Sequence, residues 1–208
     1  ELNMYEDNPL MHIEEASEET LYGKDTPVGQ LIGGPREVIR AVPRKAIVDF
    51  WKTYYQPANM VVAIAGHIDP EKTLQNVQKT FGYASEKRTR ATFLRQRGRA
   101  KKMVTRTLNR SDLQSQLGIA FASVGYGHKD LPALKLLNTI LGASMSSRLF
   151  VEVREKRGLA YAVRSDLGVY EGMGHLYIQA GVDSKRFHDA VQAITAECKR
   201  LTMEPVTE

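Results

Sequence analysis

Residues 142–163 read Gly-Ala-Ser-Met-Ser-Ser-Arg-Leu-Phe-Val-Glu-Val-Arg-Glu-Lys-Arg-Gly-Leu-Ala-Tyr-Ala-Val, and the rest of the chain is organised around them. Leu149, Phe150 and Val153 recur at the spacing that shares one face of a helix, so they are expected to point at a core. Ser146 or Ser147 precedes this run and is a residue type that caps helices. Gly158 follows a basic last turn, where a left-handed C-terminal cap is expected. The stretch therefore predicts a helix, a glycine turn and a strand that begins near residue 159.

Two side chains flank this turn, Arg154 on the last helical turn and Tyr161 just beyond Gly158. A planar guanidinium and a phenol placed in this way are able to donate hydrogen bonds to one peptide carbonyl. A purely structural reading is also open, in which Arg154 is a solvated cation at a helix end and Tyr161 is a half-buried residue of a sheet.

The same stretch resembles a signature of the insulinase-like zinc metallopeptidases (peptidase M16), which include the mitochondrial processing peptidases and pitrilysin. The resemblance rests on small residues followed by Ser-Arg-Leu-Phe, then Arg154, then Gly-Leu-Ala-Tyr at residues 158–161. In that family the signature lies in the second of two repeated halves, and its Arg and Tyr contact the substrate backbone opposite the zinc. The resemblance implies this substrate-binding role for Arg154 and Tyr161.

The first residues of the chain extend the resemblance to the zinc ligands of the family. Glu1 matches the third zinc ligand of the family, whereas the family's inverted His-x-x-Glu-His helix lies upstream and is not found in this sequence. The five histidines form no pair four residues apart. A catalytic zinc site needs three protein ligands and an open position. Zinc is therefore expected in a longer parent protein and not tightly bound by this chain alone, which also supplies no catalytic residue.

Local patterns predict an α+β fold. Helices are expected over residues 10–22, 36–41, 43–55, 70–81, 129–141 and 184–201, and strands over 60–65, 103–108, 116–121, 161–170 and 175–182. The aromatic stripe Ile47, Phe50, Trp51 and Tyr54 has the helical spacing of core residues. Alternation in the strands favours antiparallel sheets with helices packed on one face and water on the other.

The chain is expected to hold parts of two related peptidase repeats. Residues 1–84 would be the later part of the first repeat, 85–102 a basic linker, and 103–208 the earlier part of the second, substrate-contacting repeat. Residues 86–110 hold ten lysines and arginines and one acid, although the net charge of the whole chain is only +5. A nucleic-acid-binding reading of this segment is less favoured, because Phe93 is its one aromatic residue and bases stack on aromatic series.

The function that this resemblance implies is hydrolysis of peptides or small unfolded proteins by a zinc-dependent metalloendopeptidase, of which this chain would be an inactive fragment. The alternative is a catalytically silent partner or scaffold subunit of the same family. Expected partners are a peptide substrate and the remaining parts of the same peptidase chain, with a homo-oligomer left open and neither membrane nor nucleic acid expected. Cys198 is the only cysteine. A single cysteine cannot form a disulfide within the chain, and this slightly favours a location in the reducing cytoplasm.

Overall fold

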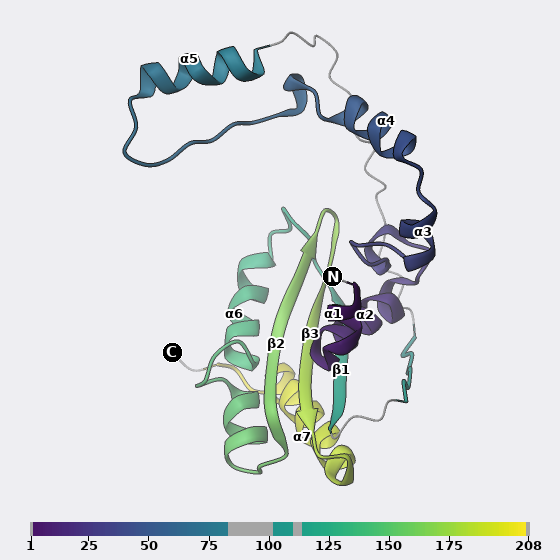
Figure 1. Cartoon of the computed structure of the whole chain (residues 1–208). Coiled ribbons are helices and arrows are strands. Elements are labelled where there is room, and N and C mark those ends of the chain that lie inside the picture. The colour runs from purple at the N-terminus through teal and green to yellow at the C-terminus, as the bar shows by residue number, and fades with distance from the viewer. Residues whose placement is uncertain (1, 83–101, 110–113, 207–208) are drawn as a thin grey trace. The chain divides into compact units, whose positions relative to one another are not determined.

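The computed structural model describes residues 2–82, 102–109 and 114–206 (Figure 1). The chain forms two compact units, of which one combines Glu1–Gly34 with Arg95–Glu208 and the other is Pro35–Leu94. The basic linker predicted at 85–102 lies almost wholly outside the described residues. The division of the chain into parts of two repeats stays a prediction.

The larger unit is built on a three-stranded antiparallel sheet. Its strands are β1 (Ser115–Ser123), β2 (Ala160–Tyr170) and β3 (Met173–Val182), in the order β1-β3-β2. A two-residue turn joins β2 to β3, and Gly172 in that turn has φ +77°, a conformation that favours glycine. The α+β class, the strand at 116–121 and the hairpin are thus confirmed.

One face of this sheet carries the hydrophobic core. Helices α6 (Leu131–Leu141) and α7 (Phe187–Met203) and the short helical turn Phe150–Glu155 pack there, and Figure 1 shows α6 alongside β2. The side chains that solvent cannot reach at all are Leu149, Val153, Ile178, Val182, Ala190 and Ile194. Burial of this apolar surface, worth about 25 cal/mol per Å², is the main force that holds the signature stretch on the sheet.

The opposite face of the sheet is covered by α2 (Pro9–Tyr22), which follows the short α1 (Leu2–Asp7). The Asn8 side chain caps α2 and Pro9 occupies its first turn, as expected where a helix begins. Gly118 lets α2 approach β1, because a Cβ at that position would stand 2.4 Å from the Ser17 hydroxyl. Strand alternation predicted that this face would be wet. The prediction was wrong because α2, which covers this face, lies far from the strands in the sequence and makes polar contacts with it, so strand alternation gives no sign of it.

The smaller unit consists of helices joined by extended chain. It holds α3 (Arg36–Ala41), α4 (Arg44–Tyr54), the turn Pro57–Asn59 and α5 (Pro70–Phe81). Asp69 caps α5 through its side chain, as the Asp-Pro sequence predicts. The prediction that the stripe on α4 belongs to a core is wrong within the described residues: Ile47, Phe50 and Trp51 are each more than half exposed, and Tyr54 is 36% exposed.

Two predicted strands are absent from the described residues. Residues 60–65 and 103–108 form no strand, and Val61 and Met103 are 96% and 95% exposed. The composition of both segments suits a strand, but strand hydrogen bonds require a neighbouring strand, and no described residue pairs with either segment. No helix of the described ranges has the length and apolar character needed to cross a membrane.

Candidate substrate-binding site

Arg154 lies on the outer side of the short helical turn Phe150–Glu155. Leu149 and Val153 are fully buried, so the turn is fixed by its inner face and Arg154 is directed outward, with 43% of its side chain exposed. The guanidinium carbon lies 4.7 Å from the centroid of the Phe150 ring, four residues earlier. This cation–π contact steadies the guanidinium, and its Nε lies 3.9 Å from Glu155 Oε1.

The helical turn itself differs from the helix that the sequence predicts. The Lys156 amide donates to the Val151 carbonyl five residues back (2.9 Å), the pattern of a π-helix. Such turns are rare in proteins, but those that occur are often found at functional sites. The predicted serine cap does not form, because the Ser147 hydroxyl is buried without a hydrogen-bond partner among the described residues and the Ser146 hydroxyl pairs with that of Ser144.

Gly158 reverses the chain as predicted. Its φ of +55° lies in the left-handed region, and its amide donates to the Arg154 carbonyl over 3.0 Å. The next amide, of Leu159, donates to the Val153 carbonyl over 2.9 Å. These two bonds close the turn and bring the start of β2 next to the end of the helical turn.

Tyr161 occupies a β-bulge at the start of β2. Ala160 is opposite Val182 and Ala162 is opposite Gly181, so Tyr161 is an extra residue between two successive ladder positions. A bulge of this kind redirects a side chain, and bulges are over-represented next to active sites. The Tyr161 side chain is 63% exposed, although Ala160 before it is buried.

Arg154 and Tyr161 line the same open pocket, which has a volume of about 430 Å³. The rest of its lining consists of Glu155, Gly158, Leu159, Ala160, Asp183 and Arg186. Leu159 and Ala160 are apolar, while the guanidinium and the phenol are hydrogen-bond donors. An extended peptide that entered this pocket would meet donors able to hold its carbonyl oxygens. Whether Arg154 and Tyr161 contact a substrate stays a prediction.

Arg186 is a residue of this pocket that sequence reasoning missed. It ends the short turn Ser184–Arg186 before α7, and its Nη1 donates to the Gly158 carbonyl over 3.3 Å. Its Nε lies 3.9 Å from Asp189 Oδ2, one turn along α7. The two bonded residues are 28 positions apart, so no local spacing could have indicated the contact.

A surface ion pair braces the same helical turn. Lys156 Nζ donates to Glu152 Oε1 over 2.7 Å, and this hydrogen bond is the main reason that the pKa of the Glu152 carboxyl is lowered. Both side chains are at the surface, where such pairs contribute about 0.3–0.5 kcal/mol. The ion pair therefore restricts the orientation of the turn and contributes little to the stability of the fold.

The described residues do not supply a zinc site. Glu1, the ligand that the resemblance implies, lies outside them, and no group of three His, Cys, Asp or Glu side chains that could hold a metal occurs within residues 2–82, 102–109 and 114–206. A zinc site needs at least three such ligands.

Comparison with known proteins shows which family this chain belongs to. The chain is 32% identical to an uncharacterized zinc protease of Mycobacterium leprae over 212 residues and 31% identical to one of Bacillus subtilis over 207 residues. Both matches cover the whole chain but only 47% and 49% of the relative. The chain thus spans about half the length of these relatives.

Solved structures share the fold. A peptidase M16 inactive domain from Pseudomonas fluorescens superposes with a TM-score of 0.83 and a protease from Helicobacter pylori with 0.85, each at 20% identity, over 98% of this chain and 49% and 50% of those chains. A chain of complex III2 from Candida albicans superposes with 0.77 at 14% identity, over 99% of this chain and 50% of that one.

A sequence profile decides the family. The profile described as "Peptidase M16 inactive domain" matches residues 41–208, which include the whole signature stretch, the Gly158 turn and the pocket residues. The chain therefore belongs to the peptidase M16 family and carries the part of it described as the inactive domain.

Proposed function

We propose that this chain is the substrate-contacting part of a zinc-dependent metalloendopeptidase that hydrolyses peptides or small unfolded proteins. The supporting observations are the zinc-protease names of the relatives, which are about twice as long, and the match to the inactive domain of the family. In this proposal the zinc and the groups that activate water belong to parts of the protein outside the described residues. Glu1 remains the proposed zinc ligand of this chain.

The single observation that carries the proposal is the common pocket of Arg154 and Tyr161. The π-helical turn, the left-handed Gly158 and the bulge at Tyr161 place a guanidinium and a phenol on one lining. Neither side chain is needed for the core, because both are more than a third exposed. Exposed donors that line one pocket beside apolar residues suit a ligand with hydrogen-bond acceptors, here the backbone of a peptide.

Kinetics of the full-length protein test the two residues. Arg154→Ala should lower kcat/KM about ten- to a hundredfold or somewhat more, since a charge-assisted hydrogen bond is worth roughly 1.5–3 kcal/mol. Tyr161→Phe removes only the hydroxyl, so it should slow cleavage and leave the melting temperature unchanged. Tyr126→Phe is the matched control, because Tyr126 is 67% exposed and lies outside the pocket. Unchanged kinetics of Tyr161→Phe would remove Tyr161 from the site.

The 208-residue chain alone is proposed to be inert. It should retain no stoichiometric zinc after dialysis and should cleave no peptide, because it lacks a His-x-x-Glu-His motif. Atomic emission and a fluorogenic peptide assay measure the two properties. Stoichiometric zinc together with chelator-sensitive cleavage by this chain would refute the assignment of the chemistry to other parts of the protein.

A silent partner or scaffold subunit is the alternative within the same family. The likeness to a complex III2 chain at 14% identity concerns the fold alone and does not favour this role. The two possibilities separate on one feature of the longer protein. A His-x-x-Glu-His sequence upstream of Glu1 would support the peptidase, and its loss would support the silent subunit.

A further inference from the structure

The polar face of the sheet meets α2 through a row of residues one helical turn apart. The Leu10 carbonyl accepts from Gln179 Nε2 (2.6 Å), Glu14 lies 3.6 Å from Arg164, and Glu18 and Tyr22 both reach the start of β3. From the beginning of α2 to its end, these partners are Gln179 on β3, Arg164 on β2 and His175 on β3. Residues at this spacing share one face of a helix, so a single face of α2 makes all of these contacts.

His175 is a buried titratable group of this interface, with 4% of its surface exposed. Its Nδ1 lies 2.8 Å from the Tyr22 hydroxyl and its Nε2 lies 3.7 Å from Glu18 Oε1. The neighbouring strand makes room for the ring, because a Cβ at Gly168 would stand 2.1 Å from the His175 Cε1 atom. The ring therefore fills a place that the backbone leaves open for it.

A neutral ring with its proton on Nε2 is compatible with these neighbours. The Tyr170 hydroxyl donates to Glu18 Oε1 over 2.7 Å, which leaves Glu18 as an acceptor beside His175. A proton on Nε2 then faces this carboxylate, and Nδ1 accepts from the Tyr22 hydroxyl. A second ring proton on Nδ1 would meet the Tyr22 hydroxyl proton, and the hydroxyl would have to turn away.

Charged groups around His175 come from two elements. Glu14 and Glu18 approach from α2, and Asp166 and Arg164 lie on β2, while β1 presents Ala122 opposite His175. Burial lowers the pKa of His175 below its ordinary value, and Glu14 and Asp166 act more weakly in the opposite direction. A lowered folded-state pKa means that docking of α2 is fully stabilised above about pH 6.5 and is weakened as the pH falls below it.

Features of the interface between α2 and the sheet would favour detachment of α2. Gln116 Oε1, on the same face of β1 as Gly118, is a buried side-chain atom with no hydrogen-bond partner among the described residues. Unpaired buried polar groups cost about 1–3 kcal/mol each, so exposure of this face to water recovers part of that cost. Gly23, with φ +89°, directly follows Tyr22 and ends α2 in a conformation that favours glycine.

We propose that His175 is a positioning residue that holds α2 on the polar face of the sheet while its ring is neutral and releases α2 when the ring takes up a second proton. The sheet and its apolar core stay folded in this transition, since α6, α7 and the Phe150–Glu155 turn pack on the other face. The device is independent of the peptidase activity proposed above.

Hydrogen exchange of the 208-residue chain tests the release directly. Protection of α2 amides, corrected for intrinsic exchange rates, should fall by up to about tenfold per pH unit below pH 6.5, the limit for uptake of one proton. Protection of α7 should not change over the same range. Loss of protection in α2 and α7 together would indicate general acid unfolding and would overturn the proposal, as would an α2 protection that does not depend on pH.

Two variants separate His175 from other acid-sensitive groups. His175→Gln keeps a side-chain amide near Tyr22 but cannot titrate, so its α2 protection should be independent of pH between 5.5 and 7.5. His188→Gln is the matched control, since His188 is an exposed histidine of α7, and it should behave as the unaltered chain. Persistence of the pH dependence in His175→Gln would overturn the assignment.

A measurement on the unaltered chain keeps the test decisive even where His175→Gln folds poorly. The Cε1–H NMR signal of His175 reports the protonation of its ring. Its midpoint should lie below the ordinary histidine pKa of about 6.5, and the transition should coincide with the loss of α2 protection. A His175 midpoint at or above that value would overturn the proposal.

Discussion

The guanidinium of Arg186 donates a hydrogen bond to the carbonyl of Gly158 over 3.3 Å, across the turn that separates Arg154 from Tyr161. Removal of this bond in Arg186→Ala should let the turn relax. A net hydrogen bond is worth about 0.5–1.5 kcal/mol, so kcat/KM in the peptidase proposed above should fall roughly two- to tenfold, with the melting temperature lowered by only about a few degrees. Lys185→Ala, in the same short turn but outside the pocket, should leave the kinetics unaltered. Equal effects of both variants would contradict a positioning role for Arg186.

Leu149 has no exposed surface and holds the signature stretch on the core. Leu149→Ala should destabilise the larger unit by about 2–5 kcal/mol, because it removes buried methyl groups and leaves a cavity. Urea unfolding followed by circular dichroism measures the change. Leu136→Ala on α6 is the control, since Leu136 is 63% exposed and should cost well under 1 kcal/mol. A loss of similar size in both variants would show that Leu149 is not the structural residue of this stretch.

Gly168 is required by the His175 ring and not by its backbone conformation. A Cβ there would stand 2.1 Å from Cε1 of the ring, so Gly168→Ala should displace His175, break its contact with Tyr22 and destabilise the docking of α2 by about 1–3 kcal/mol. Hydrogen exchange of α2 is the measurement. Gly181→Ala on β3 should be tolerated, because a Cβ there meets only glutamine side-chain atoms at 3.4 Å or more. Normal α2 protection in Gly168→Ala would rule out this packing argument.

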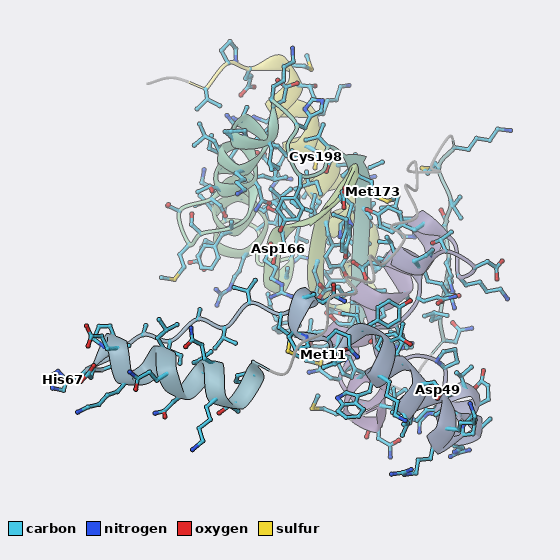
Figure 2. The ribbon with its side chains drawn as sticks, turned by 90° about the horizontal axis from the view of Figure 1, so that it is seen from above. Met11, Asp49, His67, Asp166, Met173 and Cys198 are labelled. Atoms are coloured by element: carbon cyan, nitrogen blue, oxygen red, sulfur yellow. The ribbon has the colours of Figure 1, made fainter. Side chains whose placement is uncertain are left out.

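Cys198 lies on α7, as Figure 2 shows, and its thiol is partly buried. Burial, with a further contribution from Glu197, raises the pKa of the thiol, so less thiolate is present at a given pH than in an unfolded chain. Because the thiolate is the reactive species, iodoacetamide should alkylate the folded chain several times more slowly at pH 8 than the chain in urea. Equal rates in the two states would show that Cys198 is accessible and unperturbed.

Features that depend on neighbouring residues were predictable from the sequence. The Asn8 and Asp69 caps and the left-handed Gly158 are each determined within a few residues, and all three occur in the structure. The pattern that places Leu149 and Val153 in the core is equally local. For the site, the two side chains flanking Gly158 were identified from spacing, and the structure brings both to one pocket.

Features that depend on distant residues could not be predicted. Tyr22 and His175 are 153 positions apart, so nothing local indicates that α2 covers the second face of the sheet. The segment 60–65 has the composition of a strand but no neighbour among the described residues, and composition alone does not create one. The exposed stripe around Trp51 fails for the same reason, because a core position requires a second surface.

The bulge at Tyr161 frees the side chain at this position from the requirement that strand pairing places on the rest of β2. A residue within the regular ladder has its direction fixed by strand pairing, and a slip of one position would turn every later side chain to the wrong face. Tyr161 is the extra residue between Ala160 and Ala162 and has no partner in that ladder, so strand pairing does not fix the direction of its side chain. Its side chain can be exchanged at little cost to folding. The residue at position 161 can therefore vary without a change in the register of the sheet.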